Sequence, residues 1–235
     1  MNSQAKKKHW LLGISLMILG GGMNACAIGD KTSWKEEVLL HDGKKIVVER
    51  SQTYGGRHEI GQAQPIREHT IFFTLPHSKK PITWTSEYSE DIGRTNFNLL
   101  AVHVLSDTPY LVVSPNLCLS YNKWGRPNPP YVFFKYDGKA WQRIPLPEFP
   151  AEFKTINVAL DIRGREVEEL KRAGLMSAEK IKALNAHTEI PEYKTILREP
   201  YPTASGSCAQ MVYYKGAWVG PGDSIGKKMM DRKPK

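Results

Sequence analysis

Side chains able to perform metal or nucleophilic chemistry are few in this chain, and their spacing assembles no recognisable site. Beyond the first 27 residues, no two histidines lie three to five positions apart, as paired zinc ligands on one helix do. His58-Glu59 begins such a motif, but Gln62 stands where the second histidine would be needed. We therefore predict no metal and no cofactor.

Catalytic nucleophiles and acid–base pairs have no local signature either. No G-x-S-x-G elbow occurs, and the serines of the Ser205–Cys208 loop have no base at a telling spacing. Adjacent carboxylates such as Glu36-Glu37 and Glu90-Asp91 do not provide the separation of about 5–10 Å across a cleft that glycosidase pairs need. A triad that assembles only in space is not excluded by sequence. We name no catalytic residue and expect a binding protein rather than an enzyme.

Two loops carry the residue types that dominate binding interfaces. Residues 121–131 combine aromatics, cations and prolines between two expected strands, and their candidate binding residues are Tyr121, Trp124, Arg126 and Tyr131. The alternative is a structural crossover in which Trp124 caps the core. A second loop, residues 54–59, offers Arg57 and His58 beside two glycines, with an ordinary polar loop as its alternative.

Strands must position these loops, because the pattern is chiefly that of β-structure. Two Asp-Gly pairs predict hairpins with two-residue turns, which would place Val38 opposite Val47 and Phe134 opposite Trp141. Lys215-Gly216 predicts a third hairpin, with Tyr213 opposite Trp218. Further strands are expected at residues 70–75, 82–88, 99–105 and 110–114.

Helix is expected late in the chain, as a helical hairpin at about residues 164–187. Gly174 separates its two parts, and Ser177 is the expected N-cap of the second. We predict a mainly-β fold, either a β-sandwich or a partly open barrel, with this hairpin added at a sheet edge. An α+β fold is the alternative.

The N-terminus is typical of an export signal. Residues 1–25 form a lipoprotein-type signal peptide, with three lysines followed by an uncharged run of 13 residues, Trp10 to Gly22. That run is shorter than the roughly 17–25 residues a membrane-spanning helix needs. Cleavage before Cys26 would give a lipidated, membrane-anchored protein facing the periplasm. Cleavage after Ala27 would release a soluble periplasmic protein, and an uncleaved anchor or buried helix is the third possibility.

Cysteine usage agrees with export. If Cys26 is lipidated or removed, Cys118 and Cys208 remain, and two cysteines in an oxidising compartment predict one disulfide. The bond would attach the C-terminal segment to the middle of the domain. Alternatively, Cys118 is a small buried hydrophobe and Cys208 a free thiol.

Chain length is sufficient for one domain after the signal. We expect a short tether at residues 26–33, a single domain at 34–225 and a disordered basic tail at 226–235. The tail is expected to be solvated, with anionic lipid headgroups as an alternative contact. Removing residues 1–25 lowers the formal net charge from +9 to +6, since they carry three lysines and no acid. No nucleic-acid-binding module is recognised.

Three segments, Trp34–Ser51, Ser86–Leu105 and Cys118–Leu146, resemble an uncharacterised family of exported proteobacterial proteins, some lipidated. The resemblance covers residues 34–153 and implies no activity, because the family has none assigned. We therefore expect an envelope lipoprotein that binds an unknown envelope protein or ligand without catalysis. An immunity-type protein that neutralises a toxin is one version. A periplasmic hydrolase acting on an envelope polymer or lipid, and a structural envelope protein, are the alternatives.

Processing of the N-terminus is directly measurable. The intact mass of the mature protein, taken with and without reductant, is expected to show a lipid-bearing Cys26 as the first residue and an increase of two hydrogen atoms on reduction. A mass that begins after Ala27 would contradict lipidation, and a mass unchanged by reductant would contradict the disulfide.

Overall fold

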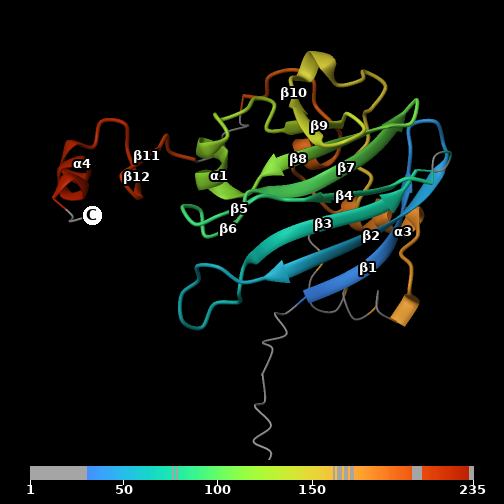
Figure 1. The fold of residues 1–235 in the computed structure, drawn as a ribbon, viewed down its shortest axis with the longest axis horizontal. Helices are drawn as coiled ribbons and strands as arrows, with labels where there is room; N and C mark the ends of the chain where they lie inside the picture. Colours follow the sequence, from blue (N-terminus) through green and yellow to red (C-terminus); the bar gives the residue numbers. More distant parts are fainter. Residues whose placement is uncertain are drawn as a thin grey trace, which may run out of the picture.

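Two antiparallel sheets of four strands each form the body of the protein in a computed structural model (Figure 1). The first sheet has the order β1-β2-β3-β4, with β1 Lys31–Leu39, β2 Lys45–Tyr54, β3 Ile66–Thr74 and β4 Pro81–Thr85. The second has the order β10-β9-β8-β7, with β7 Phe97–Leu105, β8 Thr108–Pro115, β9 Val132–Tyr136 and β10 Trp141–Ile144. The mainly-β expectation is confirmed.

Smaller elements decorate this body. Two short ladders pair β5 Tyr88–Ser89 with β6 Arg94–Thr95, and β11 Val212–Tyr214 with β12 Ala217–Val219. The helices are α1 Leu117–Lys123, α3 Ala178–Asn185 and α4 Ser224–Asp231, with 3₁₀ turns at Leu146–Glu148 and Pro191–Tyr193. The structure describes residues 31–75, 77, 79–160, 162, 166, 169, 172–202 and 208–232.

Some of the predictions concern residues that the structure does not describe. The signal peptide, Cys26 and Ala27 lie outside the described residues, as does most of the first helix of the expected hairpin. The second helix is α3, and its expected N-cap is confirmed because Ser177 Oγ accepts from Lys180 N at 3.2 Å. It packs against β1, the edge strand of the first sheet.

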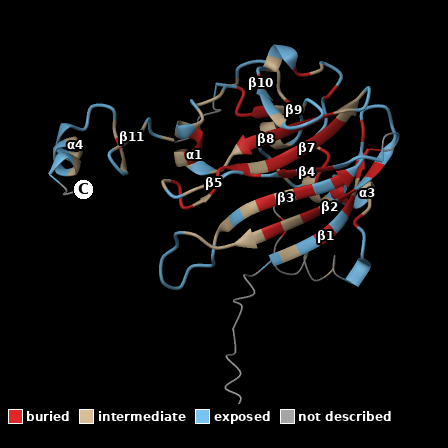
Figure 2. Ribbon diagram, in the orientation of Figure 1, coloured by how far each residue is buried: buried red, intermediate tan, exposed pale blue. Residues whose placement is uncertain are grey.

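The two sheets bury different numbers of faces (Figure 2). Strands β1 to β4 alternate buried and exposed residues, so one face of the first sheet is solvated. Strands β7 and β8 are buried on both faces. Their inner face meets the first sheet in a cluster that includes Ile71, Phe73 and Leu111. Their outer face is covered by later segments in a second cluster that includes Phe149, Phe153 and Ile196.

The register of the first hairpin differs from the prediction by one residue. Val38 is opposite Ile46, because the loop has three residues closed by Leu40 N to Lys44 O at 2.8 Å. Gly43 adopts φ +82°, the left-handed residue that follows a type I turn in such loops. The shift leaves Val47 half exposed, so the strands bury one face and not two.

In the other two hairpins, too, the length of the loop decides whether the predicted pairing is found. Asp137 Oδ1 accepts from the backbone of Lys139 and Ala140, both at 2.8 Å, and this stabilises a four-residue loop. Trp141 therefore lies opposite Tyr136, and its predicted pairing with Phe134 is wrong. At Lys215-Gly216 both residues have positive φ, and the predicted pair of Tyr213 with Trp218 is confirmed.

Both ends of the expected domain also differ from the prediction. Residues 31–33 belong to β1 and not to a tether, because they pair with residues 51–53 of β2. The tail expected to be disordered from residue 226 is helical as far as Asp231. Asp223 supplies the reason at its start, since its carboxylate accepts from Gly226 N at 2.7 Å as an N-cap.

A non-strand segment, residues 155–160, joins the edge strands β1 and β7, and we call it the seam segment. Asn157 Oδ1 accepts from Val102 N at 2.9 Å, and its Nδ2 donates to Val102 O at 2.7 Å and to Leu39 O at 3.0 Å. One side chain therefore satisfies the backbone of β7 as a neighbouring strand would, and reaches β1 as well.

Replacing Asn157 with Ala is expected to lower the free energy of unfolding by about 2–4 kcal/mol, because it leaves buried backbone groups of Val102 without partners. Urea unfolding measures the change. Asn128→Ala is the matched control, since Asn128 makes the same two-way bond with Tyr201 at an exposed site. Equal losses in the two variants would contradict the role given to Asn157.

Candidate functional site

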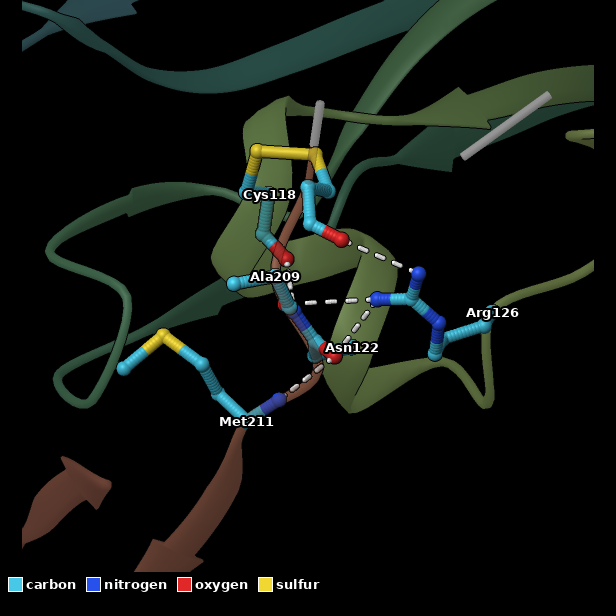
Figure 3. Close-up of a disulfide and its surroundings, with 6 residues drawn as sticks. Cys118, Asn122, Arg126, Ala209 and Met211 are labelled. Carbon is cyan, nitrogen blue, oxygen red and sulfur yellow. Dashed lines mark hydrogen bonds between the residues drawn. A yellow bond between two sulfur atoms is a disulfide. The ribbon is translucent and has the colours of Figure 1, made fainter. Parts of the chain in front are cut away.

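Residues 121–131, the first of the two predicted binding loops, lie beside the disulfide, and we call them the recognition loop (Figure 3). Cys118 and Cys208 are bonded at 2.04 Å, so the predicted pair is present. Arg126 donates to Asn122 Oδ1 and to Cys208 O, each at 3.0 Å, and its guanidinium lies 5.0 Å from the Tyr121 ring centroid. Arg126 thus holds the C-terminal segment against α1.

The other two residues predicted from this loop are also used inside the fold. Trp124 packs on Phe97 with ring centroids 4.5 Å apart, and its Nε1 donates to Asn96 Oδ1 at 3.1 Å. Tyr131 is buried, which raises its pKa, and its hydroxyl lies 2.9 Å from Glu192 O. Each polar group therefore has a partner within the chain, as the structural alternative requires.

The second predicted loop contacts the turn between β5 and β6. Arg57 N donates to Gly93 O at 2.9 Å, and Arg57 Nη2 donates to Glu90 O at 3.1 Å. Gly56 permits this approach, because a Cβ there would lie 2.2 Å from Gly93 O. His58 is exposed, and its Nδ1 lies 3.0 Å from Gly56 O.

The same turn connects this loop to the recognition loop. Asp91 Oδ1 pairs with Lys123 Nζ at 2.9 Å, and Asp91 O accepts from Trp218 Nε1 at 3.2 Å. Arg57 and α1 therefore both contact the turn between β5 and β6. Tyr131 instead packs in the second cluster, on the outer face of the second sheet.

A buried ion pair lies where the seam segment crosses the first sheet. Glu36 is fully buried, and its Oε1 lies 3.1 Å from Arg50 Nη1. Its other carboxylate oxygen accepts from Trp34 Nε1 at 3.1 Å and from Ala159 N at 3.3 Å. Arg50 also donates to Ala159 O at 2.7 Å. Both charges are therefore hydrogen-bonded as well as paired, which a buried pair requires.

A cleft of about 520 Å³ opens beside this ion pair, and we call it the polar cleft. Its volume lies within the range of small-molecule sites. The lining comes from both sheets, α1, the seam segment and residues at and beyond the end of α3: Arg50, Gln52, Ile66, His69, Asn98, Leu99, Leu100, Asn116, Leu117, Ala159, Leu160, Leu184, Asn185, His187, Thr188 and Tyr193.

Carboxamides give the cleft its chemistry. Asn185 is held by Leu160 N at 3.1 Å and Val158 O at 2.8 Å, so it shapes the wall. Gln52 accepts from the Tyr54 hydroxyl at 3.0 Å through Oε1. Among the described residues, neither the Gln52 amide nitrogen nor the Asn98 carboxamide has a hydrogen-bond partner. No Asp or Glu occurs among the described residues of the lining.

The cleft was not predicted from the sequence, although the pattern of polar residues in β1 and β2 indicates part of it. Glu36, Arg50 and Gln52 occupy inward positions of alternating strands, where Val38 and Val48 are apolar. Polar residues in the apolar phase of two paired strands indicate a buried polar site. Asn98 and Asn185 have no such pattern, because only the tertiary fold brings them to the same cleft.

Comparison with known proteins adds no relative. No family model, curated protein or solved structure matches this chain. Within the described residues, no group of three metal-ligating side chains could hold an ion. No helix in the described part of the chain has the length and apolar character needed to cross a membrane.

His103 is the one fully buried histidine among the described residues. Its ring stacks on Phe153 with centroids 4.5 Å apart, and its Nε2 lies 3.0 Å from Thr155 O of the seam segment. Since a carbonyl only accepts, Nε2 carries the hydrogen. Burial lowers the pKa of His103 to about 4, against a smaller raising effect of the Thr155 carbonyl.

Acid is therefore expected to destabilise the protein through His103. The unfolded chain protonates this side chain near pH 6.5 and the folded chain only near pH 4, so between these values the unfolded state holds one more proton. Stability is full above pH 6.5 and falls by up to about 3 kcal/mol as the pH drops to 4. Urea unfolding over this range measures the slope.

The variant His103→Gln removes the titrating group and is expected to flatten that slope. His58→Gln is the matched control, because His58 is exposed. An unchanged slope in His103→Gln would show that another group is responsible.

Proposed function

We propose that this chain is a non-catalytic binding protein of the cell envelope, and that its ligand site is the polar cleft. The observation that carries the proposal is the pair of unpartnered carboxamide groups, Gln52 Nε2 and Asn98, lining a cavity of about 520 Å³. Gln52 is buried and Asn98 is half-buried, and both carboxamides can donate or accept hydrogen bonds from a ligand that enters the cleft. The envelope location rests on the export signal in the sequence.

The lining favours an uncharged ligand with both donors and acceptors. Carboxamides supply both roles, and the charge of Arg50 is already met by Glu36. Leucine side chains also line the cleft, so the ligand is expected to present apolar surface as well. A disaccharide of N-acetylglucosamine combines hydroxyls, acetamido groups and methyl groups, and is a suitable probe.

The cysteine pair and Glu36, which could otherwise act as nucleophile or acid–base group, are engaged by the fold, and this supports binding over hydrolysis. Cys118 and Cys208 are joined to each other. Glu36 is committed to Arg50, Trp34 and the seam segment.

Titration calorimetry of the mature protein with the N-acetylglucosamine disaccharide is expected to give saturable one-to-one binding, with the sugar recovered intact. Gln52→Leu and Asn98→Leu are each expected to weaken binding about 3–10-fold, the effect of losing one hydrogen bond. Gln62→Leu, at an exposed loop position, is the matched control.

Three results would overturn the proposal. Absence of saturable binding would exclude N-acetylated sugars as the ligand. Equal affinity in Gln52→Leu, Asn98→Leu and the unaltered protein would place the site elsewhere. Hydrolysis of the disaccharide would assign the protein to the enzymes.

A further inference from the structure

Helix α4 lies at the far end of the molecule, separated from the two large sheets by the β11–β12 hairpin (Figure 1). Asp231 near its end accepts from the Tyr214 hydroxyl at 2.9 Å and from Lys215 Nζ at 2.5 Å. Lys227 Nζ, on the same side, donates to Pro221 O at 2.6 Å. The Asp231 bonds fix the rotation of the helix on the hairpin, and the Lys227 bond ties the same side to the loop before the helix, so the opposite side is directed outward.

The outward side combines aliphatic and cationic residues. Ile225, Lys228, Met229 and Arg232 are spaced i, i+3, i+4 and i+7, which places them on one face of a helical turn. All four are exposed, Ile225 by 72% and Met229 by 61%. We call these four residues the outward face.

The charge of the outward face is positive and is not offset by the helix itself. Asp231 is the one acid in α4, and it faces Lys215 and Tyr214 of the hairpin. Lys228 and Arg232 meet solvent beside the exposed aliphatic side chains, while the neighbouring Asp231 pairs with Lys215 of the hairpin.

This combination fits one occupant, an anionic lipid surface. Amphipathic helices that lie in a membrane interface place apolar side chains at the acyl boundary and cations at the headgroups. A second copy of this chain meeting face to face would oppose like charges, Lys228 and Arg232 against themselves. An anionic phospholipid surface instead offers apolar depth and complementary charge together.

We propose that the outward face of α4 docks the protein onto anionic phospholipid. The helix has eight residues and so a length of about 12 Å, which restricts it to lying on the surface. The contact is separate from the polar cleft and does not depend on how the N-terminus is processed.

Hydrogen exchange along the chain tests the contact. The mature protein is mixed with vesicles of phosphatidylcholine alone or of equimolar phosphatidylcholine and phosphatidylglycerol. Anionic vesicles are expected to slow amide exchange in residues 224–232, and neutral vesicles are not. Because exchange is resolved by position, attachment through the N-terminus does not imitate this result.

Variants separate the two components of the outward face. Lys228→Gln with Arg232→Gln is expected to weaken binding by about 25-fold, at about fivefold per cation. Ile225→Ser with Met229→Ser is expected to abolish the protection. Sodium chloride at about 1 M, where the Debye length is about 3 Å, is expected to reduce it.

Matched controls lie elsewhere on the surface. Ile60→Ser removes an aliphatic side chain that is fully exposed, and Lys139→Gln removes an exposed lysine of the β9–β10 loop. Both are expected to retain protection. Equal protection by neutral vesicles, protection that survives both double substitutions, or protection that appears without lipid at high protein concentration would each overturn the proposal.

Discussion

The structure depends on one constraint, the hydrogen bonding of a partly buried segment that belongs to neither large sheet. Residues 155–160 pass between β1 and β7 without joining either ladder, and apart from one bridge between Thr155 and Thr195 no strand pairing satisfies their backbone in the described part of the chain. Side chains take that role: Glu36 and Arg50 bind Ala159, Asn185 binds Val158 and Leu160, and His103 binds Thr155. Buried backbone groups must be paired, so these polar residues are conditions of the fold.

The polar cleft follows from the same constraint. Glu36, Arg50 and Asn185 must be near the seam segment to bind it, and this places polar side chains at one end of the space between the sheets. The polar cleft, lined in part by amide side chains, lies between residues of the two sheets at this end. The residues that close the fold and the residues offered to a ligand are thus neighbours, and the former hold the latter in place.

Local rules explain which parts of the fold could be predicted from sequence. The Tyr213–Trp218 pair was predictable because Lys215-Gly216 admits positive φ at both positions and leaves a two-residue loop. Asp-Gly at residues 42–43 and 137–138 favours a two-residue loop but also occurs in loops of three or four residues, as it does here. The loop length then depends on longer-range pairing and on side-chain bonds such as those of Asp137. The cleft was harder still to predict from sequence, since Gln52, Asn98 and Asn185 come together only in the folded structure.

Burial of β7 and β8 on both faces has a consequence for the order in which the chain can fold. Their outer face is covered by Phe149, Phe153 and Ile196, so its cover is incomplete until the chain has been made to about residue 196. During synthesis from the N-terminus, this apolar sheet surface remains at least partly exposed for the time needed to add some 80 residues after β8 ends at Pro115. Contacts so distant along the chain form slowly. The interval before completion is the period in which this protein is most prone to aggregate.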